Sequence, residues 1–189
     1  MLGSEQSDGL PLLRDEDAMS NNENTPRVWI GCLHCYNSGR LVGDWWDAGE
    51  AADVTPEDVH GKPVSESHDE LWCFDHENIP TDGELDPVTA GEWGDRYEEV
   101  TGKGYEWPAF VAYVKLGGHG DGVPDYDHFE DSYLGEYGDM RNYAEDLLTE
   151  VYGLRDIPDI IRDNVDWDGV AQDLEQDHSE QDGYIFHVA

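Results

Sequence analysis

The chain has 189 residues and carries 10 Lys and Arg against 45 Asp and Glu, so its formal net charge at pH 7 is −35. Such a surface repels DNA, RNA and anionic membranes, which excludes direct nucleic-acid binding and favours cationic partners. Apolar residues make up 38% and aromatic residues 11% of the chain, and this argues against wholesale disorder because disordered acidic chains are poor in aromatics.

Residues 1–25 mix Ser, Asn, Gly and acids without periodicity, and we expect a disordered acidic tail there. This stretch lacks the basic start and apolar middle of a signal peptide, and no apolar run approaches the length of a membrane span. The three cysteines, an odd number, fit a reducing compartment better than a disulfide framework. We therefore expect a cytoplasmic protein with no membrane partner.

Residues 26–80 are predicted to form an N-terminal α+β domain. Two β-runs, Val28–Tyr36 and Arg40–Trp46, are separated by an Asn-Ser-Gly turn that suits a short hairpin. Thr55 is followed by a proline and, at position 58, by an acid, which is the signature of a helix start. A third strand is expected over Glu70–His76.

The motif CLHC is the one metal-like feature, with Cys32 and Cys35 on either side of His34 and with Cys73 and His76 further on. Zinc needs four ligands, usually from two paired knuckles, and the chain has no second C-x-x-C. Residues three apart in a strand also point to opposite faces, which works against shared coordination. We interpret the thiols as structural, with zinc or redox use as the alternative, and assign no metal, cofactor or catalytic residue.

Residues 81–122 are predicted to form a helical middle domain. Helical periods run over Pro87–Thr101 and Trp107–Leu116, and the Gly-rich stretch 117–122 is typical of a linker or long loop. The second helix carries candidate core positions at Phe110, Val111 and Val114.

Residues 123–189 are predicted to form a mostly helical, acidic C-terminal α+β domain that ends in a strand over 183–188. A helix capped by Asp127 is expected to extend through Tyr137, and a second helix to begin at Asp139 and stop near Gly153. Shorter helices are expected after Pro158 and Asp166.

Apolar residues recur three and four positions apart between 129 and 151, so the acids between them are expected on one outer face. Acids one helical turn apart lie about 5–6 Å from each other, and B-DNA presents one charge per about 1.7 Å of axis. Adjacent acidic helices therefore approach the charge density of a duplex. We expect these acids to act as phosphate mimics: Glu130, Asp131, Glu136, Asp139, Glu145, Asp146, Glu150, Asp156, Asp159 and Asp163.

Two long segments resemble one known family. PRVWIGCLHCYNSGRLVGDWWDAG resembles the N-terminal signature of the ArdA antirestriction proteins, matched at Tyr36, Asn37, Gly39, Leu41, Gly43 and Asp47. FEDSYLGEYGDMRNYAEDLLTEVYGLRDIPDIIRDNVDWDGVAQDL resembles the C-terminal half of that family, with the same order of features. The similarity extends over residues 26–189.

The resemblance implies an elongated dimer with three small domains per subunit, encoded on mobile genetic elements. It implies a protein that imitates bent B-form DNA and inhibits type I restriction-modification enzymes by occupying their DNA-binding groove. Pairing through the C-terminal domain would place these residues near the homodimer contact: Phe129, Tyr133, Leu134 and Tyr137. The alternatives are a salt-adapted acidic module that binds cations or basic proteins, and a hydrolase that uses paired carboxylates.

Overall fold

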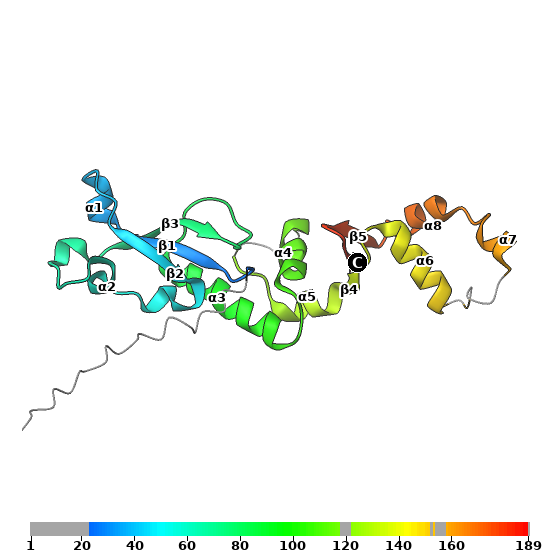
Figure 1. Ribbon diagram of the computed structural model, residues 1–189, viewed down its shortest axis with the longest axis horizontal. Coiled ribbons are helices and arrows are strands. Elements are labelled where there is room, and N and C mark those ends of the chain that lie inside the picture. Colours follow the sequence, from blue (N-terminus) through cyan, green and yellow to red (C-terminus); the bar gives the residue numbers. More distant parts are fainter. Residues whose placement is uncertain (1–22, 118–121, 152, 154–157, 189) are drawn as a thin grey trace, which may run out of the picture.

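The structure is a computed structural model that describes residues 23–117, 122–151, 153 and 158–188. It has an α+β fold with two small antiparallel sheets, as the sequence predicts. In Figure 1 the elements follow one another along one axis, with α1 and α2 near one end and α7 at the other. Within the described part of the chain, no helix combines the length and the apolar character that crossing a membrane requires.

The first sheet has strand β1 (Arg27–Cys32) at its centre, between β2 (Gly43–Asp47) and β3 (Leu71–Glu77). Both neighbours pair antiparallel to β1, and Val28 and Ile30 are fully buried. The β1–β2 pairing ends where Gly31 lies opposite Gly43. A Cβ atom on Gly43 would lie 2.5 Å from the carbonyl oxygen of Ile30, so this close approach requires glycine.

The predicted strand over Val28–Tyr36 is wrong in its second half. The chain leaves the sheet after Cys32 and forms helix α1 (Leu33–Asn37), and β2 begins at Gly43 instead of at residue 40. A short apolar run such as LHCY fits either structure, and the close glycine pair ends the strand ladder before it. Cys35 therefore lies on a helix, so the opposite orientation of side chains three apart in a strand does not apply to it.

Three short helical segments connect β2 to β3: η1 (Ala48–Asp53), α2 (Pro56–His60) and η2 (Glu66–His68). The predicted start of α2 is confirmed. The Thr55 hydroxyl accepts the backbone N–H of Asp58 at 3.3 Å, while the Asp58 carboxylate accepts the N–H of Thr55 at 2.9 Å. The hydrogen bonds from Thr55 hold the pKa of Asp58 below its usual value.

The two long helices predicted in the middle of the chain are confirmed as α3 (Pro87–Gly102) and α4 (Trp107–Leu116). The Asp86 side chain caps α3 by accepting the N–H groups of residues 88 and 89 at 3.0 Å. Gly94 faces η1 so closely that a Cβ atom there would overlap the backbone of Gly49. The glycine thus lets α3 lie directly on η1.

The helix predicted to run through Tyr137 is wrong beyond Ser132. Helix α5 (Tyr126–Ser132) is capped by Asp125, and strand β4 (Tyr133–Glu136) follows at once. Gly135 has a φ of 138°, which right-handed helices do not allow, and β4 gains backbone partners from a strand about fifty residues later. Pairing across the fold therefore overrides the local period.

The remaining helices are α6 (Met140–Val151), α7 (Asp159–Arg162) and α8 (Trp167–Leu174), close to their predicted positions. The second sheet has the order β4-β6-β5, where β5 (His178–Gln181) was not predicted and β6 (Tyr184–His187) was. The β5–β6 turn places Asp182 and Gly183 at φ values of 52° and 88°.

The described residues form two hydrophobic clusters. The larger cluster is rich in aromatic rings and runs from β1 through α3, α4 and α5 to Phe186 on β6. The smaller one joins α6 and α8 to β6 through Met140, Tyr143, Ala171 and Ile185, together with one further alanine. The larger cluster contains residues from both sides of positions 80 and 122, so packing does not mark a boundary there. The predicted division of the chain into domains at these positions stays a prediction.

Candidate acidic interaction surface

No Asp or Glu among the described residues is buried. This follows from the cost of removing an unpaired carboxylate from water, which the chain has too few bases to offset. The fold therefore separates an apolar, aromatic interior from an exterior on which the acids gather.

Helix α3 shows how the separation arises. Its side chains at Ala90, Trp93 and Val100 are buried in the larger cluster. The acids at the intervening positions are all exposed: Glu92, Asp95, Glu98 and Glu99. Positions three and four apart share one helix face, with neighbouring Cβ atoms about 5–6 Å apart. We call these four acids the α3 acid row.

Sequence reasoning missed the α3 acid row because it concentrated on the denser acids after position 125. The signal was present, since the row has helical spacing inside the predicted helix 87–101. Arg96, within the same stretch, forms an ion pair with Glu99 and so neutralises one end of the row.

Nearly all of the predicted phosphate mimics that the structure describes are exposed. They lie on α5, β4, α6 and α7 and in the turns beside them: Glu130, Asp131, Glu136, Asp139, Asp146, Glu150, Asp159 and Asp163. Glu145 is half-buried and pairs with Arg141 at 3.2 Å. Asp156 lies outside the described residues.

Some of these carboxylates are positioned by the aromatic core beneath them. Glu130 accepts hydrogen bonds from the hydroxyls of Tyr126 at 2.8 Å and Tyr105 at 3.3 Å. Burial, and then the hydrogen bond to Glu130, raises the pKa of Tyr126, so its hydroxyl stays a proton donor at neutral pH. These two hydrogen bonds thus hold the Glu130 carboxylate in a fixed position above the aromatic core.

The few bases link elements together. Arg141 on α6 contacts Glu145 on its own helix and Asp168 on α8, the latter at 3.1 Å. Lys115 at the end of α4 pairs with Asp182 in the β5–β6 turn at 2.7 Å. Both bases are about half exposed, so solvent screens each pair and its contribution to stability is small.

The four residues predicted near a homodimer contact have different environments. Phe129 is fully buried among the rings of Phe110 and Tyr133 and is therefore a core residue of the single chain. Tyr133 and Tyr137 are half-buried. Leu134 is 38% exposed and lies on β4, which is an edge strand of the second sheet.

A paired-carboxylate hydrolase would need buried acids with raised pKa values. Residues of the α3 acid row line a surface hollow of about 350 Å³ together with Arg96, but these carboxylates are exposed. Hydrogen bonds lower the pKa of Asp86 and of Asp182, so the shifts there have the opposite sign. These observations give no support to the hydrolase.

The fold and this surface define an acidic α+β protein whose charged groups are displayed on its exterior. Residues 28–186 match the family model described as antirestriction protein (ArdA), and the chain belongs to this family. Family membership implies an antirestriction protein, which is an inhibitor and not an enzyme. Comparison with curated proteins found no match.

Proposed function

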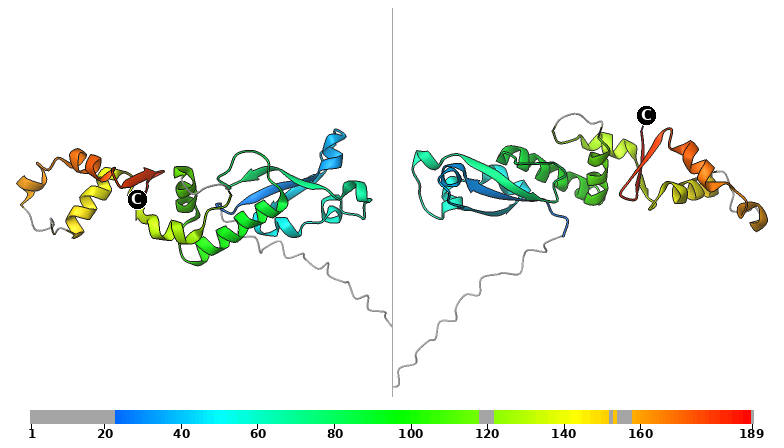
Figure 2. Two further views of the ribbon diagram at one scale, coloured as in Figure 1. Left: turned by 180° about the vertical axis from the view of Figure 1, so that it is seen from behind. Right: turned by 90° about the horizontal axis from the view of Figure 1, so that it is seen from above.

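We propose that this protein inhibits type I restriction-modification enzymes by occupying their DNA-binding groove as a mimic of bent B-form DNA. The observation that carries the proposal is the display of exposed carboxylates on successive elements over an aromatic core. Helices α3, α5 and α6 follow one another along the molecular axis (Figures 1 and 2), and each presents acids outward.

The charge is sufficient for this role. A dimer would carry twice −35, or −70, which equals the charge on a duplex about 120 Å long at one charge per 1.7 Å. A groove lined with Lys and Arg recognises phosphate oxygens through hydrogen bonds and charge, and a carboxylate offers both. No covalent step is required.

Rigidity would add to the affinity. Bending a DNA site costs roughly 1–6 kcal/mol, whereas a scaffold that is already curved avoids this cost when it binds. The proposal therefore includes the elongated arrangement of three small domains, residues 26–80, 81–122 and 123–189, held in the cytoplasm where restriction enzymes meet incoming DNA.

The homodimer is proposed to form through the edge of the second sheet. Strand β4 pairs with β6 on one side, and its other edge carries the exposed Leu134. An edge strand offers unpaired backbone groups to a second copy. Replacing Leu134 by Asp should shift the sedimenting species from dimer to monomer, whereas Leu41→Asp, at a residue that is 77% exposed outside any strand, should not.

The function is tested by competition. A type I enzyme is loaded with fluorescent DNA, and the protein is added at several salt concentrations. We expect displacement of the DNA, with an affinity that falls steeply as salt rises. Retention of the DNA by an enzyme saturated with this protein would overturn the proposal and favour the salt-adapted module.

A matched pair of variants tests whether binding depends on the position of the acids in a row or only on the total charge. The first changes the α3 acid row to Gln and Asn, and the second neutralises four exposed acids on different segments: Asp44, Glu50, Glu57 and Asp82. At about 0.5 kcal/mol for each exposed contact, the first should weaken binding by about 2 kcal/mol, or about thirtyfold. Equal losses in the two variants would contradict a specific row.

Single changes on the surface should have small effects because the charge is distributed. Glu145→Lys should change the inhibitory concentration by less than about threefold, since it alters one contact among many. A single acid whose loss abolishes inhibition would contradict distributed mimicry.

A further inference from the structure

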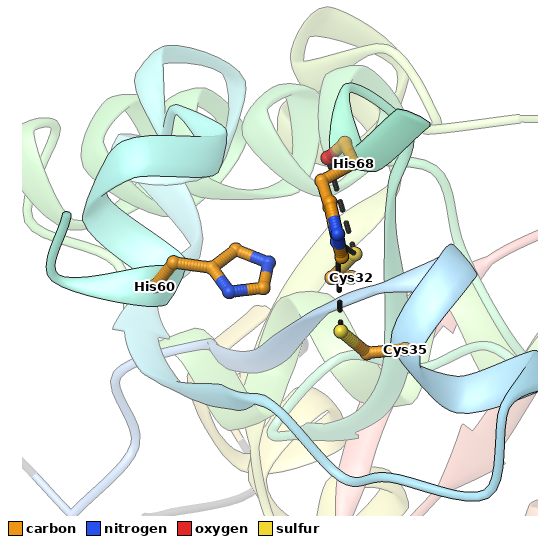
Figure 3. A group of neighbouring side chains, drawn as sticks. All are labelled: Cys32, Cys35, His60 and His68. Carbon is orange, nitrogen blue, oxygen red and sulfur yellow. Dashed lines mark hydrogen bonds between the residues drawn. The ribbon is translucent and has the colours of Figure 1, made fainter. Parts of the chain in front are cut away.

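The fold brings together four side chains from four separate elements. Cys32 ends β1, Cys35 lies on α1, His60 ends α2, and His68 ends η2. One ligand atom from each lies within 4.8 Å of the others. Figure 3 shows the two sulfurs and the two imidazole rings gathered around a common point. We call this group the Cys2His2 cluster.

The distances within the cluster match those of a metal centre. The Nδ1 atom of His68 lies 3.3 Å from the Sγ atom of Cys32 and 3.6 Å from that of Cys35. In a tetrahedral zinc site, with Zn–S near 2.3 Å and Zn–N near 2.0–2.1 Å, a sulfur and a nitrogen are separated by about 3.5 Å. Two edges of such a tetrahedron are therefore already formed.

The Nε2 atom of His60 is buried, and among the described residues it has no hydrogen-bond partner. Its ring lies edge-on to that of His68, with centroids 4.9 Å apart, and points toward the cluster (Figure 3). A buried polar nitrogen without a partner destabilises the fold unless another group satisfies it. A metal ion would do so.

The two thiols are also placed as metal ligands. Cys32 and Cys35 are each 1% exposed, and the guanidinium of Arg40 donates to the Cys35 sulfur at 3.4 Å. Outer hydrogen bonds of this kind orient first-sphere ligands. A disulfide, by contrast, would give neither histidine a role.

We propose that the Cys2His2 cluster binds one Zn²⁺ ion as a structural site. Two thiolates and two imidazoles are a ligand set that zinc favours, and four protein ligands leave no open position for a substrate. The two thiolate charges balance the charge of the ion, so the site adds no net charge to the protein.

The site would stabilise a part of the protein with few other restraints. Helix α1 and helix α2 each have five residues and η2 has three, too short for stability in isolation. Of these elements only α1 and α2 bury any side chain, one each. A zinc ion would join the connection between α2 and β3 to the end of β1, and its binding free energy would become folding free energy.

The test measures metal content on the full-length protein, purified with a non-thiol reductant and then given ZnCl2. After dialysis we expect one zinc per chain by atomic emission. Replacing zinc by Co²⁺ should produce the visible bands of tetrahedral cobalt and the charge-transfer band of two thiolates. Wild-type protein that retains no zinc, or that binds cobalt in octahedral geometry, would overturn the proposal.

Variants identify the ligands. Cys35→Ser and His60→Gln should each lower zinc affinity at least about 100-fold, beyond the 10–100-fold typical of outer-sphere partners. Cys73→Ala and His76→Gln are the matched controls, because neither side chain belongs to the Cys2His2 cluster, and both variants should keep one zinc. Zinc loss in the controls as large as in the ligand variants would contradict the assignment, and the cobalt spectrum of the wild type gives an answer even if a variant fails to fold.

Discussion

The acids around both sheets of this protein repel one another, but the apolar packing that opposes this repulsion differs in extent between the two regions. The first sheet and helices α3 and α4 enclose a large aromatic cluster, with rings such as Trp93, Trp107 and Phe110 at 3% exposure or less. Helices α6 and α8 rest on a much smaller cluster around Tyr143 and Ile185, in a part of the chain that is also rich in acids. Repulsion between carboxylates is therefore opposed by strong packing in one region and by weak packing in the other.

Apolar packing explains how a chain of net charge −35 stays folded while its acids are exposed. Apolar burial contributes about 25 cal/mol for each Å², whereas an exposed ion pair contributes 1 kcal/mol at most. The larger cluster holds the α3 acid row in place with one base, Arg96, paired to it. The smaller region depends more on links such as that from Arg141 to Asp168, which joins α6 to α8.

The strongest way to break the better-packed region is to separate α3 from η1. In Gly94→Ala the new Cβ atom would overlap the backbone of Gly49, and backbone cannot move aside as a flexible side chain can. We expect a loss of about 3 kcal/mol, measured by urea unfolding. Gly102→Ala, in the last turn of the same helix with open space around it, should be neutral or slightly stabilising, and a similar loss there would contradict the packing argument.

The difference between the regions should be visible in native-state hydrogen exchange. Amides of α6 and α8 should open at a free energy at least about 2 kcal/mol below that of β1 and α3, because fewer apolar contacts restrain them. Raising the salt concentration should narrow the gap by screening the acids. Uniform protection across both regions would show that they unfold as one unit.

The length of an element decides how well the sequence predicts it. Helices α3, α4 and α6 are long, periodic and flanked by caps or glycine, so local signals suffice. The errors fall on α1, β4 and β5, which have five, four and four residues. For segments this short, pairing with distant strands decides the conformation, and the partner of β4 begins at residue 184.

The acidic surface and the Cys2His2 cluster differ in the same way, because local spacing predicts the first and does not predict the second. Helical spacing predicts which side of α6 is exposed, because that is a local property. The Cys2His2 cluster escapes such reasoning, since His60 and His68 come from separate short elements and no spacing rule joins them to Cys32. Cys73 and His76, which follow the CLHC motif in the sequence, lie outside the Cys2His2 cluster.

A smaller effect tests whether the acids of α3 have distinct roles. Asp86→Ala removes the cap that accepts two backbone N–H groups at 3.0 Å, and we expect a loss of about 1 kcal/mol in urea unfolding. Glu92→Gln, on the outer face of the same helix, should be neutral or slightly stabilising because it relieves repulsion. Equal effects would mean that charge alone, and not capping, governs this helix.

The smallest expected effect concerns the link between the regions, the pair of Lys115 with Asp182. Asp182→Asn keeps a residue that tolerates the positive φ of 52°, so the loss should reflect the pair alone, about 0.2–1 kcal/mol at pH 7. Hydrogen bonds from Lys115 and then Gln181 lower the pKa of Asp182, so this stability is present above the unfolded pKa near 4 and is lost as pH falls through the folded pKa. The difference in unfolding free energy between variant and wild type should therefore shrink with acidification. A difference that grows as the pH falls, or one of equal size when Asp182→Asn is made in the Lys115→Gln background, would show that the turn and not the ion pair is responsible.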